Sequence, residues 1–163
     1  MVEYDEKYLD GYKQHRENSV HIISDATKID YKKLFEDNQM PQNVDYLQID
    51  LEANNGSTME TLEKLDAEIF DKHKFAVVTF EHDYYCAGEY KSTREKSRKL
   101  FEKRGYVSVF EDVHDREPSI VFEDWYVHPD LVDMEYINNL KDKNMHKYIK
   151  NIRIEYLDDY YYI

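Results

Sequence analysis

The chain has 163 residues and a formal net charge of −13, from 35 Asp and Glu residues against 22 Lys and Arg residues. Such an excess of negative charge repels phosphate backbones and anionic lipid surfaces, so we expect neither nucleic acid nor a membrane as a partner. The length fits one domain over 1–163, and the single cysteine, Cys86, excludes an internal disulfide and favours a reducing, cytoplasmic location.

Hydrophobic periodicity predicts strands and helices that alternate along the chain. The central stretch runs from Val44 to Glu52, where apolar residues alternate with polar ones, as in a strand with one buried face that ends in carboxylates. Residues 75–80 are almost continuously apolar, which is typical of a parallel strand covered on both faces. The other expected elements are helices over 5–15, 31–37, 57–70, 91–104 and 134–140, and strands over 20–23, 106–110 and 119–123. This order predicts a mostly parallel α/β sheet with a final antiparallel hairpin.

Two of the expected helices have recognisable ends. The sequence from Ser57 to Glu60 has the S-x-x-E form of a capping box, which predicts that Ser57 begins the helix that follows. Gly105 comes after the basic helix over 91–104, at a position where a left-handed residue commonly ends a helix. We interpret the lysines and arginines of that helix as a solvated face that offsets part of the acidic charge.

The order of these segments resembles the FkbM-type methyltransferases. The matching motifs are Asp-Tyr-Leu-Gln-Ile-Asp-Leu-Glu over 45–52, Phe-Ala-Val-Val-Thr-Phe-Glu-His over 75–82, Arg-Gly-Tyr over 104–106 and Phe-Glu-Asp-Trp-Tyr-Val over 122–127. The resemblance covers about residues 1–130 and rests on the order and spacing of the motifs. It implies a Rossmann-like class I methyltransferase sheet, S-adenosylmethionine as the cofactor, and methyl transfer to a hydroxyl oxygen of a small molecule or sugar.

The chain departs from the family pattern at two places. Ala53 stands where the family usually has a glycine after the strand-end acid. The family's first strand and glycine-rich turn have no counterpart, because the four glycines are isolated and Met1–Tyr4 corresponds to the last part of the second strand. The sheet is thus expected to lack its first βα unit, which leaves strand edges without hydrogen-bond partners. We expect either re-pairing of the Met1 strand or a homo-oligomer that forms through the unpaired sheet edge.

The resemblance also implies residues for cofactor binding. Glu3 corresponds to the acid that accepts hydrogen bonds from the cofactor ribose, a task that suits a carboxylate. Asp25 and Ala26 correspond to the position that meets the adenine amino group, and Asp50 lies at a strand end beside the same pocket. The alternatives are structural: Glu3 is a solvated residue at a frayed terminus, and Asp25 caps a helix or turn.

Asp50, Glu81 and His82 form a second constellation. In related metal-dependent O-methyltransferases the ends of these two strands supply ligands to Mg²⁺, so the resemblance implies a divalent cation here, although a histidine suits Mn²⁺ or zinc better. Carboxylates within about 4 Å repel by about 4 kcal/mol at an effective dielectric of 20, so their convergence requires a cation, a proton or a guanidinium. With Asp50 as its catalytic partner, His82 is also a candidate general base, because its ordinary pKa lies near about 6.5.

The same residues have a plain structural alternative, in which Asp50 caps the following loop, Glu81 pairs with a lysine and His82 is exposed. Glu52 and Asp83 are weaker candidates for the same pocket. Two other functions stay open. One is a non-catalytic binding or assembly domain of methyltransferase ancestry, and the other is a metal-dependent hydrolase that uses Asp50, Glu81 and His82.

The last third of the chain holds the remaining candidates. Glu123, Asp124 and Trp125 border the expected acceptor site, with Trp125 either a platform for a sugar or ring or simply a core residue. The tyrosine-rich tail over 158–163 offers no chemistry beyond packing or an oligomer contact.

Overall fold

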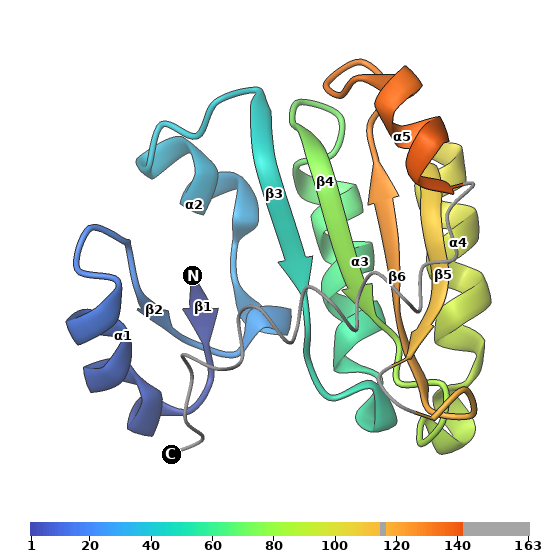
Figure 1. Ribbon diagram of the computed structural model, residues 1–163. Helices are drawn as coiled ribbons and strands as arrows, with labels where there is room; N and C mark the ends of the chain where they lie inside the picture. Colours follow the sequence, from blue (N-terminus) through green and yellow to red (C-terminus); the bar gives the residue numbers. More distant parts are fainter. Residues whose placement is uncertain (115–116, 142–163) are drawn as a thin grey trace.

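The computed structural model describes residues 1–114 and 117–141, which form an α/β structure with two separate sheets (Figure 1). The larger sheet has four strands in the order β3-β4-β6-β5, formed by Asn43–Ile49, Lys74–Glu81, Val121–Val127 and Val107–His114 respectively. The smaller sheet pairs β1 (Val2–Glu3) in parallel with β2 (Ile22–Ile23). The prediction of an α/β fold is confirmed.

The four-stranded sheet is mixed, because one strand runs opposite to the other three. β3 and β4 run parallel, whereas β6 runs antiparallel to both β4 and β5. The expected C-terminal antiparallel hairpin is therefore present, but its second strand lies between β4 and β5. β3, β4 and β5 thus point the same way and β6 alone opposes them (Figure 1), as the prediction of a mostly parallel sheet with a final antiparallel hairpin requires.

Helices connect and cover the strands within the described ranges. The α-helices are α1 (Leu9–His15), α2 (Tyr31–Asp37), α3 (Ser57–Glu68), α4 (Ser92–Lys103) and α5 (Met134–Lys141). Short 3₁₀ helices are η1 (Glu6–Tyr8), η2 (Ala26–Lys28), η3 (Ala53–Asn55) and η4 (Gly88–Tyr90). Helices α3 and α4 lie on the same face of the four-stranded sheet (Figure 1). That face is consequently the one that carries the core.

The hydrophobic core lies between the four-stranded sheet and helices α3 and α4. Phe101 of α4 is fully buried, stacks on Tyr126 of β6 with ring centroids 4.4 Å apart, and meets Phe80 of β4 edge-on. The period of two along β3 buries Ile49 and leaves Tyr46 exposed, because alternate residues of a strand point to opposite faces. This aromatic packing gives the strand ends a rigid base.

No hydrogen-bonded ladder joins the two sheets in the described part of the chain. In Figure 1, β1 lies between β2 and β3, yet β1 pairs with β2 alone. No described strand lies between β1 and β3, so the edges that these two strands turn toward each other stay open. The Met1 strand does not re-pair onto β3, and self-association through the open edge stays a prediction.

The two predicted helix ends have different outcomes. Gly105 is left-handed, with φ +82°, and follows α4 as predicted. The capping-box prediction is wrong: Gly56, with φ +83°, is the N-cap, and the Ser57 hydroxyl donates to the Glu52 carbonyl at 3.1 Å. A Cβ on Gly56 would lie 2.6 Å from the Tyr90 ring, so close packing and a left-handed backbone both select glycine here.

Two further predictions concern the membrane and the tail. Among the described residues, no helix has both the length and the apolar composition that crossing a bilayer requires. The tyrosine-rich tail over 158–163 lies outside the described ranges, so its role in packing or assembly stays a prediction.

Candidate functional site

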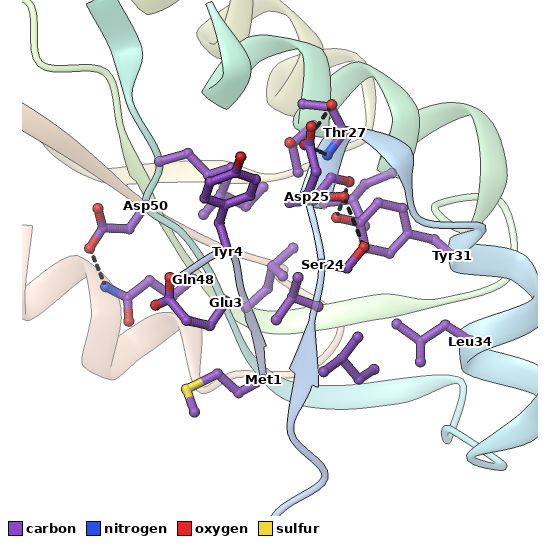
Figure 2. Close-up of a pocket in the computed structure, with 18 of the residues that line it drawn as sticks. Met1, Glu3, Tyr4, Ser24, Asp25, Thr27, Tyr31, Leu34, Gln48 and Asp50 are labelled. Atoms are coloured by element: carbon purple, nitrogen blue, oxygen red, sulfur yellow. Dashed lines mark hydrogen bonds between the residues drawn. The ribbon is translucent and has the colours of Figure 1, made fainter. Parts of the chain in front are cut away.

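A cleft of about 1820 Å³ lies between β1 and β3 and reaches the carboxyl ends of the parallel strands. Its lining comes from β1 and the residues after it, from the turn after β2, from β3, and from the first turns of α3. Figure 2 shows Tyr4, Asp25 and Asp50 at this edge, each just beyond the end of a strand. Because open α/β sheets bind ligands at the carboxyl ends of their strands, this cleft is the candidate functional site.

The cleft is strongly acidic. Eight carboxylates line it against two basic side chains, Arg16 and Lys28. The acids are Glu3, Asp5, Asp25, Asp50, Glu52, Glu60, Glu81 and Asp83. Charges of one sign between low-dielectric walls focus the electric field, so the cleft attracts cations and repels phosphates and carboxylates.

Three of these acids meet where β3 and β4 end. Asp50 follows β3 and accepts a hydrogen bond from the Gln48 amide at 3.2 Å (Figure 2), and Glu81 is the last residue of β4. Burial, a hydrogen bond with Asp50 and the charges of Asp50 and Asp83 raise the pKa of Glu81 to about 10. Burial and the charge of Asp50 also raise the pKa of Asp83. With this raised pKa, Glu81 carries a proton at neutral pH.

Thr61 on α3 adds a buried polar group to the cleft. Only 3% of the residue is exposed, it lines the cleft, and its Oγ1 has no hydrogen-bond partner among the described residues. A buried hydroxyl left unpaired costs about 1–3 kcal/mol, so it marks a place where water or a ligand supplies the bond. The neighbouring buried residues Leu62 and Leu65 hold α3 against the core and fix the position of this hydroxyl.

The predicted cofactor residues line the cleft and already have protein partners. Glu3 accepts hydrogen bonds from a backbone N–H at 2.9 Å and from the Tyr12 hydroxyl at 3.2 Å. Asp25 accepts from the N–H and the hydroxyl of Thr27 at 2.9 and 2.7 Å, so it caps η2, as the structural alternative predicts. Ala26 begins η2 and also lines the cleft. A carboxylate has about four acceptor sites, so these bonds orient Glu3 and Asp25 without excluding a ligand.

His82 lies outside the cleft. It follows Glu81 directly, and because successive residues of an extended chain point to opposite faces, its side chain is fully buried on the other side. Its Nε2 lies 3.4 Å from Asp124, and its Nδ1 accepts from the Tyr84 N–H at 3.2 Å. The structure therefore does not bring His82 together with Asp50 and Glu81, and its role as general base or metal ligand stays a prediction.

His82, Asp112 and Asp124 form the one group in the described ranges whose spacing could hold a metal ion. A guanidinium already occupies its centre. Arg98 donates to Asp124 from Nε at 2.7 Å, and from Nη2 to both Asp112 and Asp124 at 2.9 Å. Asp124 also accepts from the Asp112 N–H at 2.7 Å and the Tyr126 hydroxyl at 3.1 Å. These bonds use the acceptor capacity of the carboxylate, so the group fits a buried ion pair better than a metal site.

The ion pair with Arg98 lowers the pKa of Asp124, whereas the pKa of Glu81 in the cleft is raised. Burial alone would raise the pKa of Asp124, but hydrogen bonds from His82 and Arg98 outweigh it and hold the pKa well below its usual range. Sequence analysis misses Arg98, which it assigns to a solvated face. The available signal was Asp124 itself, a charged residue among the apolar residues of a strand, because a buried carboxylate requires a partner.

No protein-family model, curated protein or solved structure matches the chain. The functional inference therefore depends on the geometry and the charge of the cleft.

The divalent cation implied by the resemblance does not fit this cleft. His82, the third predicted ligand, is turned away from Asp50 and Glu81 and is fully buried. Within the part of the chain that the structure describes, Asp50 and Glu81 belong to no group of three ligands close enough to bind one ion. The cleft therefore favours an organic cation over a bare metal ion.

Trp125 is a packed residue of the sheet. Its ring meets Phe110 edge-on with centroids 5.7 Å apart, and its indole N–H donates to the Glu123 carboxylate. Trp125 is half-buried and does not line the acidic cleft. Its role as a platform for a sugar or ring stays a prediction.

Proposed function

We propose that the chain is a methyltransferase-like domain that binds S-adenosylmethionine in the acidic cleft and transfers its methyl group to a hydroxyl oxygen. The excess of eight carboxylates over two basic side chains in the cleft carries this proposal. S-adenosylmethionine has two positive charges, at its sulfonium sulfur and its ammonium group, against one carboxylate, so its net charge is positive, and its ribose has a diol that donates hydrogen bonds. Carboxylates bind all three groups well, whereas the same acids disfavour phosphate-bearing ligands.

The strand arrangement supports the proposal. β3 and β4 are parallel and are followed in the chain by the antiparallel pair of β5 and β6. This is the order expected for a Rossmann-like class I methyltransferase sheet with an antiparallel hairpin at its C-terminal end. We include that finer fold, as one domain over 1–163, in the proposal.

Each proposed role follows from the place of a residue in the cleft. Glu3 is the last residue of β1, and Asp25 and Ala26 lie after β2, where they border the space proposed for the ribose and the adenine. Thr61 offers its buried hydroxyl, which has no partner among the described residues. Asp50 lies beyond the end of β3, where its negative charge favours a bound sulfonium.

Methyl transfer requires a base. The methyl group moves from the sulfonium sulfur to the oxygen of the acceptor, and the hydroxyl proton of the acceptor moves to a carboxylate. Asp50 is the proposed proton acceptor, because Glu81 already holds a proton at neutral pH. The acceptor itself is a hydroxylated small molecule or sugar without phosphate groups, since the acidic cleft repels them.

Isothermal titration calorimetry of the full chain with S-adenosylmethionine tests this proposal. We expect saturable binding with a Kd of about 1–100 μM, and we expect Asp50→Asn to weaken it at least about tenfold. Glu36→Gln is the matched control, because Glu36 is exposed on α2 and does not line the cleft. No binding heat at about 1 mM ligand overturns the cofactor assignment.

The same titration detects the proton of the acid cluster. A bound cation favours the ionised form of Glu81, so binding near neutral pH should release a proton. Titrations in buffers with different ionisation enthalpies should then give different heats, and Glu81→Gln should remove that difference. Heats independent of the buffer would show that the ligand lies away from Glu81.

A non-catalytic binding or assembly domain is the second candidate function. The observation that favours it is the open edge between β1 and β3, together with the absence of a glycine-rich turn among the four isolated glycines. Methyl transfer from radiolabelled S-adenosylmethionine to a panel of hydroxylated compounds separates the two functions. Binding without transfer to any of them supports the second candidate.

A further inference from the structure

The open edges of β1 and β3 face each other across the cleft. β1 pairs only with β2, β3 pairs only with β4, and the arrows of β1 and β3 point the same way in Figure 1. Val2 of β1 and Leu47 of β3 line the same cleft. A parallel strand placed between them would have a hydrogen-bonding neighbour on each side.

The backbones of both strands turn hydrogen-bonding groups toward this gap. The carbonyls of Met1 and Glu3 accept from N–H groups of β2 at 3.0 and 2.9 Å. Bonding direction alternates along a strand, so the N–H and C=O of Val2 point to the other edge, toward β3. The carbonyl of Gln42 accepts from the first residue of β4 at 2.7 Å, so the same alternation turns the N–H and C=O of Leu47 toward β1.

The gap has an apolar base and an acidic rim. Leu34 and Phe35 of α2, Leu65 of α3 and Phe75 of β4 line the cleft and belong to the core or pack against it. The carboxylates gather at the strand ends, as at Asp50. The volume of about 1820 Å³ exceeds the range of roughly 300–1,000 Å³ that is typical of small-molecule pockets. A ligand of nucleoside size therefore leaves room for a further element.

We propose that this gap receives an extended peptide strand from a partner chain, parallel to β1 and β3. The side chains of that strand that face α2 and α3 are apolar, which matches the base of the gap. The residue at its carboxyl end is basic, which matches the acidic rim. Such a strand joins the two sheets into one and provides partners for both open edges.

None of the strands that the structure describes is free to fill the gap of a second copy, which favours a partner chain. The two strands of the small sheet and the four of the large sheet, which are the strands that the structure describes, all have a pairing partner. A second copy could donate one of them only by breaking a ladder of its own. Two β3 edges cannot meet directly, because β1 lies in front of that edge in each copy (Figure 1).

This inference is independent of the small ligand, since the gap and its backbone groups are the same whether or not S-adenosylmethionine binds. A strand tethered to the full chain tests it at high effective concentration. The probe is Thr-Val-Val-Ile-Val-Gly-Lys, fused before Met1 through a Gly/Ser linker of about 20 residues, which spans about 25 Å and allows a parallel return. We expect the Tm to rise by at least about 5 °C, and exchange of the Val2 and Leu47 amides to slow at least about tenfold.

The matched control carries proline at every second probe position, which removes backbone donors and keeps an apolar segment. Equal stabilisation by probe and control, or unprotected Val2 and Leu47 amides with the strand probe, overturns the proposal. Gel filtration with light scattering on the unmodified chain is a second test, because it measures the oligomeric state. A monomer supports the proposal, whereas a dimer with protected Val2 and Leu47 amides assigns the gap to a second copy and overturns it.

Discussion

Two neighbouring strands carry acids that the protein treats in opposite ways. Asp124 on β6 is fully buried, and its pKa lies well below the usual range. Glu81 on the adjacent strand β4 is half-buried, and its pKa is raised to about 10. Asp124 pairs in register with Phe80, one residue before Glu81, so Asp124 and Glu81 point to opposite faces of the sheet and meet different neighbours.

The charged groups beside each acid cause this difference in pKa. Asp124 has a guanidinium, from Arg98, on both of its oxygens, whereas Glu81 faces the carboxylates Asp50 and Asp83. A buried carboxylate with its cation belongs to the scaffold, because removal of either partner leaves an unpaired charge. Carboxylates that share a proton still lack a cation, so the second group is the one ready to bind a positively charged ligand.

The largest expected effect comes from removing Arg98, the cation that compensates the buried carboxylate of Asp124. Arg98→Ala leaves Asp124 buried without its cation, which should cost about 3–5 kcal/mol of unfolding free energy. Urea unfolding followed by circular dichroism measures this loss. The matched control is Glu111→Gln: Glu111 lies 3.5 Å from Arg98 but is half-exposed, so its loss should cost less than about 1 kcal/mol.

The same variant tests the metal alternative at His82, Asp112 and Asp124. If Zn²⁺ or Mn²⁺ restores the Tm of Arg98→Ala and leaves the parent protein unchanged, the group holds a cation of either kind. A loss below about 1 kcal/mol on removal of Arg98 would contradict its role as the compensating charge.

A smaller effect is expected at the rim of the cleft. Gly56→Ala places a Cβ against the Tyr90 ring at a residue with φ +83°, which should cost about 1–3 kcal/mol. Gly11→Ala is the control, because nothing lies within 4 Å of its added Cβ in α1, and it should stabilise the chain by about 0.4–1 kcal/mol. Equal Tm values for the two variants would show that the rim does not depend on this left-handed turn.

The two acidic regions should have opposite pH dependence. The pKa of folded Glu81 is raised from 4.5, so its contribution to stability is present below about pH 4.5 and is lost as the pH rises toward its folded pKa. The pKa of Asp124 is lowered from 3.8, so its contribution is present above about pH 4 and is lost as the pH falls further.

The Glu81→Gln variant isolates the contribution of Glu81 to the pH dependence of stability. Its Tm should exceed that of the parent by about 2–4 °C at pH 8, and by less at pH 5, because glutamine pays no cost of ionisation. Thermal melts between pH 4 and pH 9 measure the difference, with Glu36→Gln as the control. A Tm difference that does not change with pH would contradict the shared proton.

The smallest expected effect concerns charge balance in the cleft. Lys28→Ala removes one of its two cations, and Lys28 meets Glu60 only through an exposed pair at 3.5 Å. The Tm should stay unchanged, while the affinity for S-adenosylmethionine should rise about twofold at low salt and less at high salt. Weaker binding would show that Lys28 contacts the ligand directly.

The sequence by itself determined where the acids of the cleft begin. Alternation over 44–52 predicts a strand that ends in the carboxylates Asp50 and Glu52, and the apolar run over 75–80 predicts a second strand that ends at Glu81. The structure has β3 and β4 at these places, in parallel, so the two carboxyl groups meet. Local patterns suffice here because period and strand length are properties of consecutive residues.

Only the tertiary structure decided what the remaining residues do. His82 is turned away from Glu81, and β6 is inserted beside β4, so that Asp124 lies within reach of Arg98 on α4. The gap between β1 and β3 likewise appears only when the two sheets are placed side by side. Pairing and the approach of helices depend on residues far apart in the chain, and no local periodicity encodes them.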